Sequence, residues 1–243
     1  MDNFQLLYFT LIFFLAGITT ELIGFGVATV SMALLPFILP LPIALPLVAL
    51  ISAAATGIVT LKSRAVGLMK LVAPLLIGSF IGVPLGILFL KTIEGKALGL
   101  ALGVFLIAYA IYGLYLNGHL FMAASRASGT LTGLVAGFFG ASFNIHGPLI
   151  SLYSSSNSHL SHEDTKGLIS SYMFFTGLFV IAGHAFSGRV TIEVLRYALL
   201  ALPFLLLGLI AGAKLFRHIN LLWLKRGIYI IALAAGLSLL LVG

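Results

Sequence analysis

Thr19-Thr20-Glu21-Leu22-Ile23-Gly24-Phe25-Gly26 interrupts the first long apolar run of this chain with glycine and polar residues. A second apolar run, in the other half, is interrupted by Gly137-Phe138-Phe139-Gly140-Ala141-Ser142-Phe143-Asn144-Ile145-His146-Gly147-Pro148. Interrupted hydrophobic segments at corresponding places in two halves are typical of secondary transporters, where they form the binding site. We therefore expect a site for a small solute between the two stretches.

The composition is that of an integral membrane protein. The chain is 61% hydrophobic and 8% charged, with a mean hydropathy of +1.20, whereas about a quarter of the residues of a soluble domain are charged. Its apolar stretches of roughly 16–25 residues can each cross a bilayer. We expect one membrane domain over residues 1–243. The first segment lacks the basic start and cleavage site of a secretory signal, so we expect it to be retained.

The charge and the cysteine count exclude little. Most Lys and Arg residues behind the net charge of +7 fall in short loops, where they orient a membrane protein. They form no aromatic-interleaved tract of the kind that binds nucleic acid. There is no cysteine, so the chain has no disulfide and its redox compartment stays open.

Apolar patterning divides the chain into two similar halves. The segments that we expect are a broken unit at 4–39 and helices at 44–61, 67–90 and 97–116, then a linker at 117–129, a broken unit at 130–156 and helices at 167–186, 192–213 and 222–242. The repeats are thus about 4–116 and 130–243, each a Gly-broken helix or re-entrant hairpin followed by three transmembrane helices.

Glycine and basic residues support the repeat. Gly17 and Gly24 match Gly133 and Gly140 at an offset of 116, and Lys70, Gly82, Gly86 and Lys91 match Arg196, Gly208, Gly212 and Arg217 at an offset of 126. The paired glycines four apart form small faces that let helices approach closely. The change of offset predicts about ten extra residues in the second half, where the polar stretch at 154–164 lies.

The basic loops predict the topology. One loop carries Lys62, Arg64 and Lys70 and another carries Lys214, Arg217, Lys225 and Arg226, so both should be cytoplasmic. They share a face only if the second broken unit enters and leaves by the same face or crosses twice. The repeats are then inverted, and both termini are non-cytoplasmic.

The first break favours anion binding. Gly24-Phe25-Gly26 frees backbone groups that lipid cannot satisfy, and a half-helix that starts after it directs N–H groups into the protein. The alternative is a glycine kink that only lets helices pack closely.

The second break adds side-chain donors. Ser142, Asn144 and His146 alternate with apolar residues, so an extended stretch would place all three on one side. Gly147-Pro148 suits the first turn of a new helix. Hydroxyl, amide and imidazole donors beside a helix N-terminus suit an oxyanion, although a membrane histidine can also serve only helix packing.

Charged and polar side chains elsewhere are further candidates. Glu21 lies inside an apolar segment, where it would relay a proton or pair with a basic group. His184 is a second relay candidate, or an interfacial residue. Small polar residues that could line a cavity, or only join helices, are Ser52, Thr56, Ser170, Ser171, Tyr172 and Thr176.

We predict no metal site and no cofactor. His159, His162, Glu163 and Asp164 lie close together in the sequence, but they do not have the H-E-x-x-H spacing of a zinc site, and a solvated loop explains them better.

The paired breaks resemble those of the TauE/SafE sulfite exporter family, in the toluene-sulfonate uptake permease superfamily. The resemblance rests on Gly17, Gly24-Phe25-Gly26, Pro36 and the Lys62/Arg64 loop, and on Gly133, Gly140 and Gly147-Pro148. It implies transport of sulfite, organosulfonates or sulfoacetate across a bacterial-type inner membrane. The family's G-x-G-G-G-like run is reduced here, since Ser142, Asn144 and His146 replace glycines at the second break.

The sequence thus predicts an all-α polytopic membrane protein with two inverted repeats, which carries a small sulfur-containing anion by alternating access. Its expected partners are this anion, the lipid bilayer and protons as a coupling ion, with no nucleic acid. Alternatives are an anion channel and an intramembrane serine hydrolase built on Ser142 with His146 or His184. The latter lacks a full G-x-S-x-G elbow, so we expect no enzyme. The expected substrate-binding residues are Gly24, Phe25, Gly26, Ser142, Asn144, His146 and Gly147.

Overall fold

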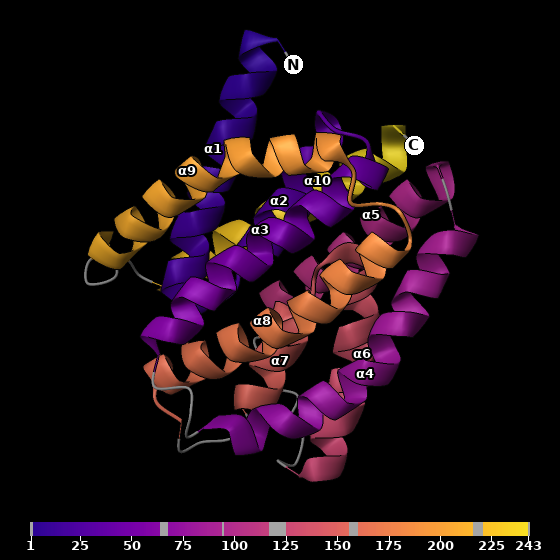
Figure 1. The fold of residues 1–243 in the computed structure, drawn as a ribbon. Helices are drawn as coiled ribbons and strands as arrows, with labels where there is room; N and C mark the ends of the chain where they lie inside the picture. The colour runs from indigo at the N-terminus through magenta and orange to yellow at the C-terminus, as the bar shows by residue number, and fades with distance from the viewer. Residues whose placement is uncertain are drawn as a thin grey trace.

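The computed structural model describes residues 2–63, 68–93, 95–116, 125–155, 160–215 and 221–242, which are helical apart from short connections (Figure 1). The first half contains α1 (Asn3–Ile23), α2 (Val27–Leu34), the 3₁₀ helix η1 (Leu35–Phe37), α3 (Leu41–Lys62), α4 (Met69–Thr92), α5 (Lys96–Ile111) and the π-helical turn η3 (Tyr112–Leu116). The second contains α6 (Arg126–Phe143), α7 (Gly147–Ser155), α8 (His162–Phe186), α9 (Ile192–Leu215) and α10 (Leu221–Val242).

Seven of the described helices are long and apolar enough to cross a membrane. They are α1, α3, α4, α5 continued into η3, α8, α9 and α10. The expected all-α, multi-pass fold is therefore confirmed.

Two expected loops contribute residues to helices. In the polar stretch at 154–164, Ser161 accepts a hydrogen bond from the Asp164 amide at 3.1 Å and caps α8. Arg126 begins α6 inside the expected linker at 117–129. Some residues used in the sequence analysis lie outside the described ranges, among them Arg64, residues 117–124 of the expected linker, His159 and Arg217.

The helices pair reciprocally across the two halves. α1 packs against α9, and α6 packs against α4, so each broken helix lies beside the second full helix of the other half. Figure 1 shows the first pair on the left and the second at the lower right. α3 packs against α8, and α5 against α10, so these helices lie beside their own counterparts.

Each helix that packs on its own counterpart is antiparallel to it. Gly57 of α3 lies against Phe174 of α8, whereas Ser63, later in α3, lies against Gly167, earlier in α8. The same direction holds for α5 and α10, by the contacts Gly103–Gly236 and Tyr109–Tyr229.

Glycine contacts fix how the two halves correspond. Gly82 of α4 lies against the carbonyl group of Leu134, and Gly208 of α9 lies against that of Phe14. The α4 and α9 helices therefore correspond at an offset of 126 (82 to 208), as the sequence predicts, and α1 and α6 at 120 (14 to 134). The expected offset of 116 for the broken helices was wrong. The expected and observed offsets differ by four residues, which is about one helical turn. Both offsets therefore place glycines on the same face of the helix.

The first broken unit starts and finishes at the same end of the molecule. Glu21, near the end of α1, forms an ion pair with Lys62, the last residue of α3 (3.3 Å). The C-terminal ends of α1 and α3 are therefore side by side, and residues 24–40 run back along the length of the helices between them.

The second broken unit is built in the same way. Near the ends of α6 and α8, Ser142 and Gly183 lie against neighbouring residues of α4, Gly86 and Ile87. The C-terminal ends of α6 and α8 are therefore also side by side. As a result, the start of α1 and the end of α10 lie at the same end of the molecule, at the top of Figure 1.

Candidate functional site

The first break is a turn that glycine alone fits well. Gly24 ends α1 in the left-handed conformation (φ 83°), and its amide donates to the Thr20 carbonyl oxygen at 2.8 Å. A Cβ atom on Gly24 would lie 2.9 Å from the Lys166 carbonyl oxygen. Both the backbone conformation and the close approach of α8 therefore require glycine.

After this turn, α2 begins beside the last turn of α1. The Val27 amide donates to the Thr20 hydroxyl oxygen at 2.9 Å. A side chain of α1 thus takes one of the free N–H donors of the new helix. Fewer donors at this N-terminus are left for a ligand.

The second break differs from the expected extended stretch. α6 continues through Phe143, and Asn144 ends it in the left-handed conformation (φ 60°), as Gly24 ends α1. Asparagine tolerates this conformation because its short side chain bonds locally or nearby. Ser142 is therefore a helical residue, and the prediction that Ser142, Asn144 and His146 lie on one side of a strand was wrong.

The three polar side chains of the second break diverge. Ser142 Oγ faces Gly86 of α4, where a Cβ atom would lie 3.1 Å from it. Asn144 Nδ2 donates to the Leu45 carbonyl oxygen of α3 at 2.9 Å. The His146 ring lies over Gly140, where a Cβ atom would overlap Nδ1.

The two breaks touch each other at Phe25 and Gly147. A Cβ atom on Gly147 would overlap the first atoms of the Phe25 ring. Phe25 is only 3% exposed. The ring thus lies against the first residue of α7, so the breaks are brought together as the sequence predicts, with an aromatic side chain between them.

The second break also contains buried polar atoms that have no partner among the described residues. Ser142 Oγ and both ring nitrogens of His146 make no hydrogen bond within the described part of the chain. Ser142 is fully buried, and His146 is 4% exposed. The His146 ring packs edge-to-face on Tyr172, with centroids 5.8 Å apart. Unpaired buried donors next to a helix N-terminus are suited to a ligand that carries acceptor oxygens.

The expected cavity-lining residues are buried and mostly bonded. The Tyr172 and Ser79 hydroxyls are 2.7 Å apart, and Thr56 and Ser171 donate to the Ser52 and Gly167 carbonyl oxygens at 2.7 Å each. Ser170 donates to the Gly24 carbonyl oxygen at 3.3 Å. Thr176 is also fully buried, one turn after Tyr172. In this conformation the Tyr172 and Ser170 hydroxyls join α8 to α4 and to the first break, whereas those of Thr56 and Ser171 bond within their own helices.

Glu21 pairs with two lysines. Its carboxylate lies 2.8 Å from Lys166 Nζ and 3.3 Å from Lys62 Nζ. A pocket of about 240 Å³ lies here, lined by these three side chains with Val59, Ser63, Glu163 and Ala213. Of the two roles left open by the sequence, pairing is the one that this geometry favours. The sequence analysis missed Lys166 because it lies 145 positions from Glu21.

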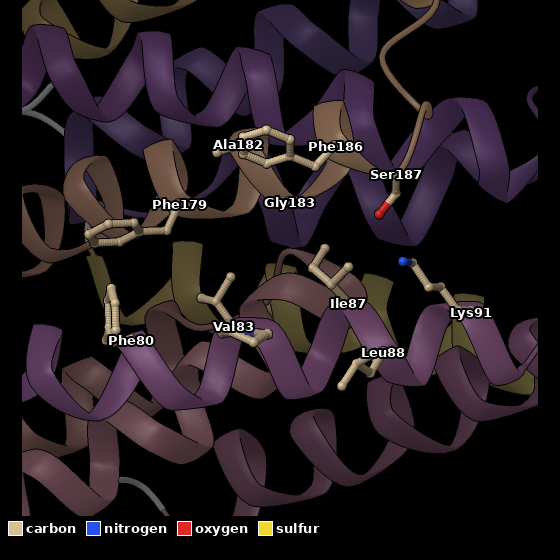
Figure 2. A pocket seen from close by; sticks show the side chains of 11 residues that line it. Phe80, Val83, Ile87, Leu88, Lys91, Phe179, Ala182, Gly183, Phe186 and Ser187 are labelled. Carbon is tan, nitrogen blue, oxygen red and sulfur yellow. The ribbon is translucent and has the colours of Figure 1, made fainter.

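A larger pocket, of about 460 Å³, lies between α4 and α8 (Figure 2). Phe80 and Phe179 stand at one end of it and Lys91 and Ser187 at the other, with Val83 and Ile87 between them. His184, one helical position beyond the lining residue Gly183, is fully buried, and neither of its ring nitrogens has a hydrogen-bond partner among the described residues. His184 therefore lies inside the protein near one end of the helices.

Other constellations considered from the sequence are not assembled within the part of the chain that the structure describes. Among the described residues, no three His, Asp or Glu side chains form a group that could hold a metal ion. His162 instead lies 3.3 Å from the Leu22 carbonyl oxygen. Neither Ser142 nor a histidine shows the nucleophile–base hydrogen bond of a hydrolase within the same residues.

A comparison with protein families identifies the family of this chain. The family model described as sulfite exporter TauE/SafE matches residues 9–239. No curated protein matches the chain, and neither does any solved structure. The match extends over both breaks and nearly all the helices, so the chain belongs to the TauE/SafE family of membrane transporters for sulfur-containing anions, which are not enzymes.

Proposed function

We propose that this protein is a secondary transporter that moves a small sulfur-containing anion by alternating access of two inverted repeats. The observation that carries the proposal is the contact of the two breaks at Phe25 and Gly147, together with the buried polar atoms of Ser142 and His146 in the second break, which have no partner among the described residues. An oxyanion such as sulfite or an organosulfonate offers several acceptor oxygens to such donors. The anion would lie where the Phe25 ring now meets α7.

Helix direction supports inverted repeats. A two-fold axis in the membrane plane reverses the direction of any helix that packs on its own counterpart. The α3–α8 and α5–α10 pairs are both antiparallel, as that axis requires.

The basic residues support an orientation. Glu21 contacts Lys62 at the end of α3 and Gly212 near the end of α9, so the connections that follow these two helices lie at one end. These are the two most basic loops of the chain. We propose that this end is cytoplasmic and that both termini lie outside, in a bacterial-type inner membrane.

Flux into liposomes tests the function. Purified protein should take up labelled sulfite or methanesulfonate and concentrate it when an ion gradient is applied. Movement only down the anion's own gradient would instead identify a channel.

A matched pair of histidine variants tests the site. His146→Ala removes a donor to a charged ligand, so affinity should fall by roughly 10- to 150-fold. His162→Ala removes an exposed histidine and should leave affinity unchanged within about twofold. Equal affinities in the two variants would place the site elsewhere. Asn144 already bonds Leu45, so in this proposal it shapes the break and also contacts the ligand only after a conformational change.

Proton coupling is a further part of the proposal, with His184 as one candidate residue and Glu21 as the other in a state where its lysine pairs are broken. Glu21→Gln should abolish uptake driven by a pH step but preserve counterflow of substrate, which moves no net proton. A Glu21→Gln protein that still concentrates the anion after a pH step would remove Glu21 from the coupling path.

A further inference from the structure

The pocket at Glu21 is built around a buried positive charge. The Lys166 side chain is 10% exposed and that of Glu21 8%, whereas that of Lys62 is 54% exposed. A buried ammonium group without a counter-charge is costly, so Lys166 needs an anion close to it. Glu21 provides that anion, and Lys62 links the pair to solvent.

This pocket adjoins the first break directly. The backbone of Lys166 lies against Gly24, and Ser170, one turn later in α8, bonds the Gly24 carbonyl oxygen. The next residue, Phe25, contacts the second break at Gly147. Gly24 next to the pocket and Phe25 at the contact between the breaks are therefore consecutive residues.

The helix correspondence gives this pocket a counterpart. With the offset of 120 from α1 and α6 extended to α3 and α8, and 126 kept for α4 and α9, Val59, Ser63 and Ala213 correspond to Phe179, Gly183 and Ile87, which line the pocket of Figure 2. The two pockets thus occupy equivalent places in the two halves. In a transporter made of inverted repeats, the repeats exchange roles about a central site, so we assign the two pockets to the routes from the two faces.

The charges have no counterpart in the other half. At the offset of 120, Glu21, Lys62 and Lys166 correspond to Ala141, Ala182 and Pro46. The ion pairs are therefore not needed to build this helix arrangement, because the other half forms it without them. They are a feature of one route only.

We propose that Lys62 and Lys166 form an anion-binding subsite on this route, that Glu21 occupies the subsite when no substrate is bound, and that a sulfonate-type oxyanion displaces it. This inference deepens the proposed function and rests on it. Sulfonate and carboxylate oxygens accept hydrogen bonds from the same ammonium donors. The exchange keeps Lys166 paired throughout, so it avoids the cost of an unpaired buried charge. The displaced Glu21 carboxylate moves toward solvent past Lys62.

Binding of methanesulfonate to the purified protein tests the exchange. In Glu21→Gln the tethered competitor is gone, so the affinity for methanesulfonate should rise by about tenfold or more. Adding Lys166→Gln to this variant should abolish the gain. Glu193→Gln is the control, since it removes the same charge from an exposed position in the first turn of α9, and its affinity should equal that of the wild type.

A second variant tests the same subsite if the Glu21→Gln protein does not fold. Glu21→Asp keeps the charge but shortens its reach to Lys166, so it should raise the affinity in the same direction by a smaller factor. An unchanged or weaker affinity in whichever variant folds, with wild-type transport intact, overturns the subsite and leaves the proposed function standing. If the wild-type protein carries no anion, the proposed function itself fails.

Discussion

The pocket at Glu21 and the pocket of Figure 2 stand on equivalent helices, yet they are closed by different means. The first holds an acidic side chain between two lysines and has a volume of about 240 Å³. The second, of about 460 Å³, is lined by aromatic and aliphatic side chains, with Lys91 at one end. The same backbone arrangement thus accommodates a charged closure on one side and an apolar one on the other. The two pockets therefore differ in their side chains, although the helices around them are arranged in the same way.

The largest expected effect comes from breaking the ion pair between Glu21 and Lys166. Lys166→Met leaves Glu21 buried with only the half-exposed Lys62, so the free energy of unfolding should fall by about 2–4 kcal/mol, at or below the usual cost of breaking a buried pair. Chemical unfolding in detergent would measure it. Lys91→Met in the other pocket should change stability by less than about 0.5 kcal/mol, because Lys91 is exposed. Equal losses in both variants would contradict the contrast between the pockets.

The equivalence of the two halves can be tested with glycine. Gly82→Ala and Gly208→Ala each place a methyl group against a backbone carbonyl group of the neighbouring broken helix. Both should destabilise the protein by about 1–3 kcal/mol, and to a similar extent. Gly99→Ala is the control, since nothing lies within 4 Å of its Cβ position and alanine favours the helix by about 0.5–1 kcal/mol. Very different losses at Gly82 and Gly208 would argue against equivalent packing.

Cysteine labelling has the smallest energetic effect, and it tests which faces the pockets serve. Cysteines replacing Ser63 and Leu222 should react with a membrane-impermeant reagent from the cytoplasm. Cysteines replacing Gly95 and Ser187 should react from outside. Reaction of Ser63→Cys and Ser187→Cys from the same side would show that the two pockets do not serve opposite faces.

Much of the fold could be predicted because the helices have strong local signals. Long apolar runs between glycine, proline and basic residues gave the number and approximate ends of the helices. The alignment of the broken helices was harder. Gly17 meets a glycine at an offset of 116 (Gly133) and also at an offset of 120 (Gly137), so alignments one turn apart are hard to tell apart.

The site was predicted in position but not in detail. Alternation of polar residues at Ser142, Asn144 and His146 is too short to separate a strand from a helix end, and the left-handed Asn144 decides for the helix. The Glu21–Lys166 pair and the contact of Phe25 with Gly147 depend on packing between residues far apart in the sequence. No local pattern could have predicted them.

The Phe25 ring against Gly147 also has an electrical consequence. If water fills both pockets, the layer of tightly packed residues between them is much thinner than the bilayer. The membrane potential then falls mainly across this thin layer, where each elementary charge is worth about 2.3 kcal/mol per 100 mV. An anion that moves past this ring would therefore carry its charge through most of the voltage in one step, and this step of transport should depend on membrane potential.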